Sequence, residues 1–235
     1  PCRSNRIRCS CRSSLQPFSK NVWSKIKKVV LNMVETRHVK AGQVTFGNDL
    51  PLALIAGPCQ MESRDHAMEM AAACKELTEK LGVGFVFKAS FDKANRTSLD
   101  SYRGPGMQEG LKILDSIRHD YQVPIISDIH ETYQVEEAGA VLDVLQIPAF
   151  LCRQTDLLVA AARTGEAINL KKGQFLSPWD MTNAVNKIRA AGNNTLRLCA
   201  RGGSLGYNNL VVAMRALPVS RCLGCRVSFY PISRV

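Results

Sequence analysis

The sequence predicts an α/β fold, a (β/α)8 barrel that is incomplete, with about six of the eight units present after an N-terminal β-hairpin. Short, continuous apolar runs alternate along the chain with longer stretches of helical periodicity, a pattern typical of a parallel sheet covered by helices. Polar residues follow directly after each apolar run. Because the mouth of a barrel is built at the carboxyl ends of its strands, this placement favours a barrel over a doubly wound sheet.

The elements are expected in the following order. Residues 39–46 alternate and are followed by Gly47-Asn48-Asp49, a turn sequence, so we expect a short hairpin there. Six strands are predicted by apolar runs at residues 52–56, 85–88, 125–128, 142–147, 167–171 and 196–199. Helical periodicity between and after them predicts helices at residues 63–81, 107–120, 131–139, 156–164 and 178–191.

This pattern divides the chain into three parts. Residues 39–217 form the partial barrel, and residues 218–235 lack strand or helix periodicity and are expected to be an irregular, non-native tail. Residues 1–38 are basic and are expected to be disordered or non-native. The composition of residues 1–32 is that of an organelle transit peptide or of upstream sequence translated in error with Met33 as the start, and we favour the second.

The net charge of +11 is confined to the ends of the chain. Residues 1–40 hold ten Lys and Arg and one acid, and residues 218–235 hold three Arg and no acid. Residues 41–217 hold 18 bases and 19 acids, a net charge of −1. A nearly neutral middle does not provide the basic groove that nucleic acid requires, so we expect no nucleic-acid partner.

Cysteine usage and hydropathy bear on the compartment. The middle region carries four cysteines at scattered spacing: Cys59, Cys74, Cys152 and Cys199. This arrangement suits reduced thiols in a cytoplasmic protein. No window approaches the roughly 18 consecutive apolar residues of a membrane span, so no membrane association is expected.

Basic residues collect where predicted strands end. Residues 88–97 follow the second strand and contain two Lys, an Arg, an Asn and two hydroxyl side chains. The fifth strand ends in Lys171-Lys172, and Arg201 follows the sixth. One such run alone is usually a solvated loop. Three basic strand ends at the same mouth favour a site for an anionic substrate, because Arg offers a bidentate fork for phosphate and Lys a compact charge.

Several long segments resemble the 3-deoxy-D-manno-octulosonate-8-phosphate synthase family. The matching segments are Ile55-Ala56-Gly57-Pro58-Cys59, residues 87–98, residues 146–156, residues 169–175 and residues 206–212. They follow the family's order and spacing from about Val39 to Pro218. The Lys93-Ala94-Asn95-Arg96-Thr97-Ser98 stretch distinguishes this family from its sister, the synthase that makes a seven-carbon product from erythrose 4-phosphate.

The resemblance implies a role for each matching side chain. Phosphoenolpyruvate would be bound by Lys88, Lys93, Gln146, Ala149, Lys171 and Arg201. Arabinose 5-phosphate would be bound by Ser90, Asn95, Arg96, Thr97 and Arg153. The catalytic residues would be Asp128, Lys93 and Asn95. Because the family's counterpart of Arg153 reaches the sugar phosphate of a neighbouring subunit, the resemblance also implies a homo-oligomer, a tetramer in the family.

Cys59 matches the cysteine ligand of the family's metal-dependent branch. A thiolate suits zinc or iron, and manganese also serves in this branch. A lone cysteine after a buried strand is otherwise a small core residue. The family's other ligands, a His, a Glu and an Asp, come from the last third of the barrel. No matching segments occur here, so we expect this chain to bind the divalent metal poorly.

The implied activity is the condensation of phosphoenolpyruvate with D-arabinose 5-phosphate and water, which serves lipopolysaccharide biosynthesis. Two alternatives stay open: a catalytically inactive fragment of that synthase, truncated on its C-terminal side, and the sister synthase. Two departures bear on activity. Ala200 stands before Arg201 where the family has an acid, and Ala213 stands where the family tends to have Asp.

Overall fold

The computed structural model describes residues 38–207 and 209–230. The predicted basic segment 1–38 therefore lies, apart from His38, outside the described residues. Within the described part of the chain, no helix combines the length and apolar composition needed to cross a bilayer.

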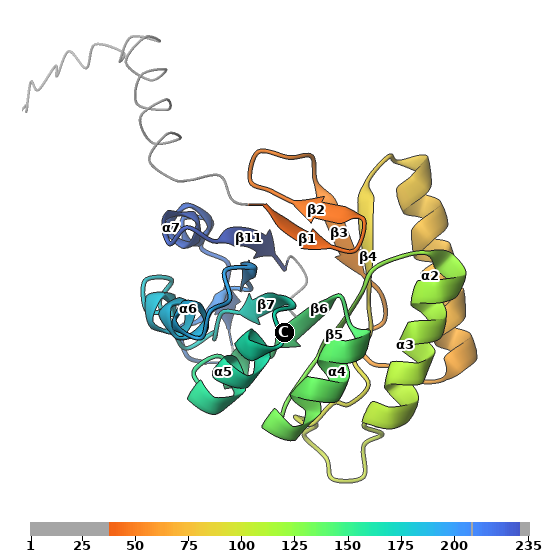
Figure 1. Cartoon of the computed structure of the whole chain (residues 1–235). Coiled ribbons are helices and arrows are strands. Elements are labelled where there is room, and N and C mark those ends of the chain that lie inside the picture. Colours follow the sequence, from red (N-terminus) through yellow and green to blue (C-terminus); the bar gives the residue numbers. More distant parts are fainter. Residues whose placement is uncertain (1–37, 208, 231–235) are drawn as a thin grey trace, which may run out of the picture. The chain divides into compact units, whose positions relative to one another are not determined.

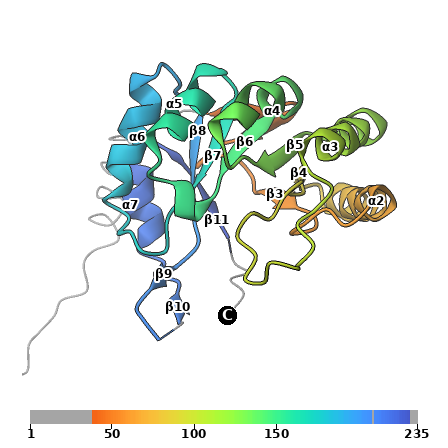
Figure 2. The ribbon, with the colours of Figure 1, turned by 90° about the horizontal axis from the view of Figure 1, so that it is seen from below.

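A seven-stranded parallel sheet forms the centre of the fold, and its strands follow the order of the chain from one edge to the other (Figure 1). The strands are β3 (Ala53–Ala56), β4 (Gly84–Lys88), β5 (Ile125–Asp128), β6 (Val144–Ile147), β7 (Ala167–Lys171), β8 (Leu196–Ala200) and β11 (Arg226–Phe229). The helices are α2 (Arg64–Lys80), α3 (Met107–Tyr121), α4 (Val135–Val141), α5 (Thr155–Arg163), α6 (Met181–Ala190) and α7 (Ala216–Cys222). Figure 2 shows these helices outside the curved sheet. The predicted incomplete (β/α)8 barrel is confirmed.

The last unit is longer than the sequence pattern indicates. The prediction that residues 218–235 are irregular is wrong for residues 218–229, because α7 extends to Cys222 and β11 adds a seventh strand. β11 pairs in parallel with β8, and the Tyr230 amide continues the ladder by donating to the Ala200 carbonyl at 2.9 Å. The polar residues Arg226 and Ser228 interrupt the apolar pattern of this strand, so it was not predicted from the sequence.

Helix boundaries follow local chemistry. Ser63 caps α2 by accepting a hydrogen bond from the His66 amide at 3.1 Å, as a side-chain oxygen does at a helix N-terminus. Leu111, Leu114 and Ile117 recur at helical spacing in α3 and are buried against the sheet. Sequence periodicity therefore located both helices to within about a residue.

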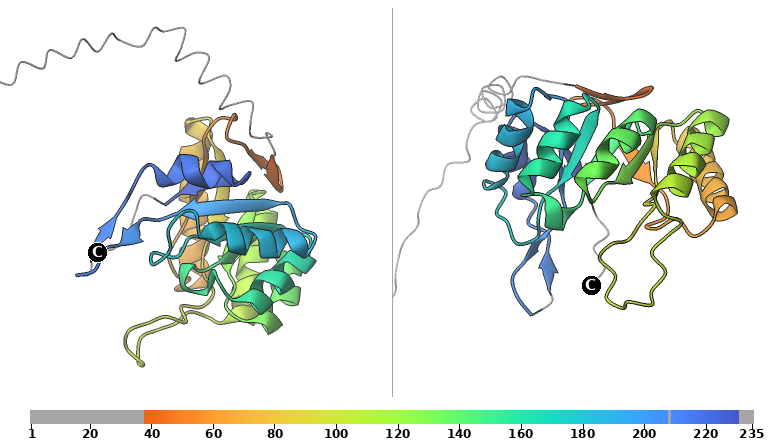
Figure 3. Two further views of the ribbon diagram at one scale, coloured as in Figure 1. Left: turned by 90° about the vertical axis from the view of Figure 1, so that its left-hand side faces the viewer. Right: turned by 60° about the horizontal axis from the view of Figure 1, so that its bottom comes forward.

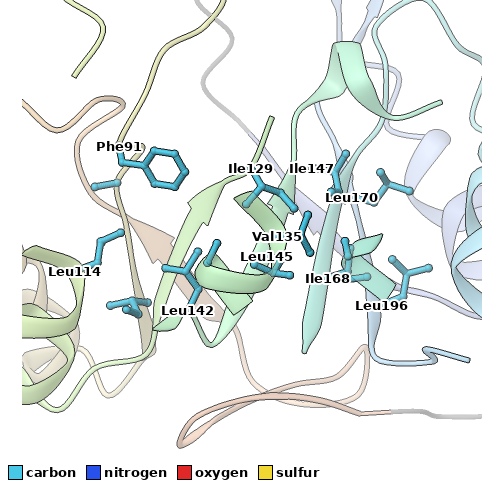
Figure 4. Packing of buried hydrophobic residues seen from close by; sticks show 14 of the residues in the cluster. Phe91, Leu114, Ile129, Val135, Leu142, Leu145, Ile147, Ile168, Leu170 and Leu196 are labelled. Atoms are coloured by element: carbon cyan, nitrogen blue, oxygen red, sulfur yellow. The ribbon is translucent and has the colours of Figure 1, made fainter. Parts of the chain in front are cut away.

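The two faces of the sheet bury different clusters. Side chains facing the helices form the larger apolar cluster (Figure 4), which includes Phe91, Leu114, Ile147 and Leu170. Side chains facing the lumen alternate with these along each strand. The lumen cluster includes Val86, Ile126, Val144 and Ala167, and it packs against the N-terminal hairpin.

The hairpin consists of β1 (Val39–Ala41) and β2 (Val44–Phe46) and was predicted correctly. Its turn lies at Gly42, within the alternating segment, and not at the Gly47-Asn48-Asp49 sequence. Gly42 has φ +53°, and a Cβ there would meet the Pro124 ring at 3.0 Å. Two further segments, the loop between β4 and α3 and the small hairpin β9–β10 (Gly203–Ser204 and Leu210–Val211), project from the opposite end of the sheet (Figure 3).

Candidate active site

Asp128 is the centre of a polar cluster at the carboxyl end of the sheet. It is the last residue of β5 and is only 3% exposed. Its Oδ1 accepts hydrogen bonds from Gln146 Nε2 at 2.7 Å and from Lys171 Nζ at 3.0 Å. Its Oδ2 accepts a hydrogen bond from the Ser90 hydroxyl. Groups from three adjacent strands and the loop after β4 therefore meet at one carboxylate.

Lys88 and Lys93 approach the same carboxylate from β4 and the loop that follows it. The Lys88 ammonium lies 3.5 Å from Asp128 Oδ2, and the Lys93 ammonium lies 4.0 Å from it. Both also donate to the Ser90 hydroxyl, at 2.7 Å and 3.2 Å. The Ser90 hydroxyl thus accepts hydrogen bonds from two cations and donates one to the carboxylate.

Charge and burial in this cluster shift ionisation strongly. Burial alone would raise the pKa of Asp128, but the ammonium groups of Lys171, Lys88 and Lys93 together hold that pKa well below its usual range. Burial lowers the pKa of Lys88 to about 8, a shift that the neighbouring Asp128 only partly offsets. Near neutral pH the cluster therefore holds a carboxylate and three predominantly positive amines, a net charge close to +2.

A close backbone contact brings Cys59 over this cluster. Gly57 has φ +146°, and a Cβ at this position would lie 2.2 Å from the Lys88 carbonyl oxygen. Only glycine lets the segment after β3 pass so close to β4. As a result the Cys59 carbonyl accepts a hydrogen bond from Lys88 Nζ at 3.1 Å. Burial raises the pKa of the Cys59 thiol, but the charges of Lys93 and Lys88 outweigh it and lower that pKa overall.

The residues at Cys59 do not by themselves fit a metal ion. Across residues 38–207 and 209–230, no group of three or more His, Cys, Asp or Glu side chains is arranged to hold one. Cys59 lies instead beside two ammonium groups, whose charge opposes a nearby cation. We therefore derive no chemical step through a metal.

Three other side chains continue the cluster into the lumen beneath Gln146. Gln146 Oε1 accepts a hydrogen bond from Asn169 Nδ2 at 2.7 Å, and Asn169 Oδ1 accepts one from the Ser228 hydroxyl at 3.5 Å. Ser228 in turn accepts from Arg197 Nη2, and the Arg197 guanidinium lies 3.5 Å from the centre of the Phe46 ring. None of these three side chains was predicted as a site residue from the sequence. Asn169 could have been found, because it lies two positions before Lys171 and so faces the same side of β7.

Two predicted phosphoenolpyruvate residues lie on elements that flank the cluster. Ala149 is buried in a short 3-10 turn, Ala149–Leu151, directly after β6. Arg201 follows β8 and is half-buried, with its guanidinium carbon 5.5 Å from the centre of the Tyr230 ring. Burial and, to a smaller extent, the Arg201 charge lower the pKa of Lys172, so Arg201 lies toward the end of β7. Both residues are at the same end of the sheet as Asp128.

The structure does not bring the predicted sugar-phosphate residues into the cluster, with the exception of Ser90. Asn95, Arg96 and Thr97 are exposed in the long loop after β4. Arg96 Nε donates to the Tyr102 carbonyl at 3.1 Å, a contact within the loop itself. Arg153 is exposed before α5, where its carbonyl accepts from Lys187 Nζ at 3.2 Å.

The cluster suits a small, multiply charged anion. Three ammonium groups, those of Lys88, Lys93 and Lys171, lie within 4.0 Å of the Asp128 carboxylate. Among the described residues, this one carboxylate pairs with all three. Incoming phosphate or carboxylate groups would take over ammonium hydrogen bonds that Asp128 and Ser90 accept in the structure. Because burial weakens competition from water, each such contact is stronger here than on the surface.

Comparison with known proteins shows the family of this chain. The family model described as the DAHP synthetase I family matches residues 27–227, most of the chain. The chain belongs to the DAHP synthetase I family. Within it, residues of this chain are similar to proteins named 2-dehydro-3-deoxyphosphooctonate aldolase, which is another name for the synthase that the resemblance indicated.

Three of these relatives give the extent of the similarity. The protein from Syntrophotalea carbinolica is 60% identical, and those from Brucella ovis and Brucella abortus are each 58% identical. Each match covers 191 residues, which are 81% of this chain and 69% of the relative. The chain is therefore similar, over about four fifths of its length, to relatives named 2-dehydro-3-deoxyphosphooctonate aldolase.

Proposed function

We propose that this chain is a 3-deoxy-D-manno-octulosonate-8-phosphate synthase, a transferase that condenses phosphoenolpyruvate with D-arabinose 5-phosphate and water. The convergence of Lys88, Lys93 and Lys171 on Asp128 carries the proposal, since it provides fixed positive charge for a phosphate and a carboxylate. The names of the relatives identify the reactants.

The reaction forms one carbon–carbon bond and breaks one carbon–oxygen bond. C3 of phosphoenolpyruvate attacks the aldehyde carbon of the sugar, and the aldehyde oxygen takes a proton. Water adds at C2, and its oxygen becomes the new ketone oxygen as phosphate leaves by C–O cleavage. In this proposal Lys88, Lys93 and Lys171 stabilise the negative charge of the departing phosphate, and Gln146 and Ala149 line the same pocket. Orientation and electrostatics then supply most of the acceleration.

The sugar side of the site is proposed to form from Ser90, Asn95, Arg96 and Thr97, together with Arg153 of a neighbouring subunit. Asn95 and Lys93 act at the reacting carbons beside Asp128. Arg153 is exposed, as a residue that serves a neighbouring subunit must be before assembly. A homo-oligomer, a tetramer by family, is therefore part of the proposal, and sedimentation of the purified chain measures it.

A divalent metal of the zinc, iron or manganese type is expected from the family, and we propose that this chain binds it poorly, because Cys59 belongs to no group of metal-ligating side chains among the described residues. When bound, such an ion would act as a Lewis acid. We also propose a cytoplasmic location, supported by the six free cysteines among residues 38–207 and 209–230.

Phosphate release tests the proposal directly. Phosphate release is measured with and without added divalent metal. Purified chain should release phosphate only when both phosphoenolpyruvate and arabinose 5-phosphate are present. Replacement of the pentose phosphate by erythrose 4-phosphate should abolish release, and retention of activity would identify the sister synthase instead. Absence of turnover under all conditions, together with co-purification with a full-length relative, would identify an inactive fragment.

A further inference from the structure

A single row of polar side chains crosses the lumen from Asp128, at the centre of the lysine cluster, to Arg197. Strand register places Asp128 opposite Gln146, Gln146 opposite Asn169, and Asn169 opposite Arg197. These four residues therefore lie side by side across four adjacent strands, with their side chains in the barrel interior. All four are buried, and Arg197 at the far end of the row stacks on Phe46 of the hairpin.

The two ends of this row fix the direction of every hydrogen bond in it. The Asp128 carboxylate can only accept, and the Arg197 guanidinium can only donate. Donation therefore runs from Arg197 to Ser228, from Ser228 to Asn169, from Asn169 to Gln146, and from Gln146 to Asp128. The hydrogen bond from Ser228 to Asn169 is long, at 3.5 Å. The bonds from Asn169 to Gln146 and from Gln146 to Asp128 are both 2.7 Å.

Asn169 holds the central place in this row. A Gln amide can turn by 180° and exchange its oxygen for its NH2 group with little change of shape. Asn169 presents NH2 to Gln146, so the Gln146 oxygen faces Asn169 and its NH2 group faces Asp128. If Gln146 were turned, two oxygens would face each other at Asp128, a repulsive contact in a buried site.

We propose that Asn169 is a positioning residue of the active site, which holds the Gln146 amide in the orientation that donates to Asp128. Through Gln146 it keeps Asp128 charged and in place, so that Lys88 and Lys171 stay aimed at the anion they bind. Asn169 is 2% exposed and acts beneath the pocket without touching the reactants. The effect on ligand affinity rests on the proposed function, whereas the orientation of Gln146 does not.

Two substitutions and a matched control test this role. Asn169→Asp keeps the shape but replaces the donor with an acceptor, which favours the turned Gln146 amide. Asn169→Leu removes the hydrogen bonds without reversing them. Asn193→Asp is the control, because Asn193 is equally buried but its Nδ2 donates to the carbonyls of Ala162 and Glu166, which are not part of the cluster.

Affinity for phosphoenolpyruvate is measured by calorimetry between pH 5.5 and pH 8, and the Gln146 side-chain NH2 resonances are measured by ¹⁵N NMR, assigned with Gln146→Met. Asn169→Asp should weaken affinity at least tenfold and move the Gln146 resonances. Asn169→Leu should cause smaller changes in affinity and in the Gln146 resonances. Asn193→Asp should lower the melting temperature but change affinity less than twofold and leave those resonances in place.

The outcomes separate the two claims. If wild-type chain binds neither phosphoenolpyruvate nor inorganic phosphate, the proposed function fails, and the Gln146 resonances still decide the role of Asn169. If wild-type chain binds and both Asn169 variants match Asn193→Asp in affinity and resonances, the inference about Asn169 is overturned. Unfolding of Asn169→Asp leaves Asn169→Leu, with its smaller electrostatic change, to give the same two readouts.

Discussion

The lysine cluster around Asp128 and the exposed loop after β4 carry the two halves of the predicted site, and they are built very differently. Lys88, Lys171 and Gln146 extend from strands. Lys171 and Gln146 donate hydrogen bonds to the buried Asp128 carboxylate, and Lys88 pairs with it at 3.5 Å. Asn95 and Arg96 lie on a projecting loop with exposed side chains. Strands fix the first group before any ligand arrives, whereas the second must be ordered by the ligand or by a neighbouring subunit.

This contrast indicates how the two reactants would be recognised. A preorganised cluster loses little entropy on binding, so the smaller anion gains affinity from geometry that already exists. Residues on the loop would have to lose side-chain freedom when they bind the sugar phosphate, which costs roughly 0.5–1.5 kcal/mol for each flexible side chain. Substitutions in the cluster should therefore affect stability and binding together, and substitutions in the loop should affect binding alone.

Asp128→Asn should have the largest effect. It leaves the three ammonium groups without their shared carboxylate, which should lower the free energy of unfolding by about 3–5 kcal/mol at pH 7, the range for a broken buried ion pair. The folded pKa of Asp128 is depressed, so this contribution is present above the unfolded pKa and is lost as pH falls through the folded pKa. Urea unfolding from pH 2 to pH 7 measures it.

Asp115→Asn provides the comparison for that measurement. Asp115 pairs with Arg118 on the exposed face of α3, so its loss should cost less than about 1 kcal/mol. Equal losses for the two variants would show that burial adds nothing to the Asp128 pairs, and the contrast between cluster and surface would disappear.

Gly57→Ala should rank second. The new methyl group would meet the Lys88 carbonyl, so the segment carrying Cys59 must move away from β4. Strained backbone alone costs about 1–3 kcal/mol, and the clash adds to it. Gly82→Ala is the control, because Gly82 also has positive φ, +62°, but nothing lies within 4 Å of an added Cβ. Thermal unfolding should show the greater loss for Gly57→Ala, and phosphoenolpyruvate affinity should fall only in that variant.

Lys88→Arg should alter pH dependence more than stability. The pKa of Lys88 is about 8, so wild-type chain loses a positive charge above that pH and its affinity for phosphoenolpyruvate should fall, by up to tenfold for each pH unit. Arginine stays charged, so the fall on this limb should shrink or vanish in the variant. Lys187→Arg, on α6 and outside the Asp128 cluster, should keep the wild-type profile. Parallel profiles for all three proteins between pH 7 and pH 9.5 would contradict a role for Lys88 charge.

Arg96→Ala should have the smallest effect on the folded chain. Arg96 is exposed and its described hydrogen bond stays within its own loop, so the free energy of unfolding should change by less than about 0.5 kcal/mol. Affinity for arabinose 5-phosphate should fall while affinity for phosphoenolpyruvate stays the same. Calorimetry with each ligand separates the two, and a loss for phosphoenolpyruvate would show that the loop and the cluster are not independent.

Much of the fold was predictable from local pattern. Continuous apolar runs such as Ile125–Asp128 gave strand positions to within about two residues, since both faces of a barrel strand are buried. β11 was not predictable, because Arg226 and Ser228 break the apolar pattern. Ser228 is accommodated by the lumen, where it accepts a hydrogen bond from Arg197 and donates one to Asn169, and only the folded arrangement of strands reveals that environment.

Part of the site was also predictable from the sequence. The carboxyl ends of parallel strands meet, so basic residues such as Lys88 and Lys171 could be expected together. Their convergence on Asp128 and the contribution of Asn169 depend on strand register, which no single segment encodes. The placement of Asn95 and Arg96 depends on a long loop, for which periodicity gives no information.

Asn48, just after the N-terminal hairpin, binds the edge of β11 through its side-chain amide. Its Nδ2 donates to the Cys225 carbonyl at 3.4 Å, and its Oδ1 accepts from the Val227 amide at 3.4 Å. One side-chain amide thereby imitates a peptide group against the outer edge of β11, the strand at the end of the sheet. A further strand could pair with this edge only after displacing Asn48. The segment after the hairpin therefore protects the edge of the sheet from non-specific strand addition.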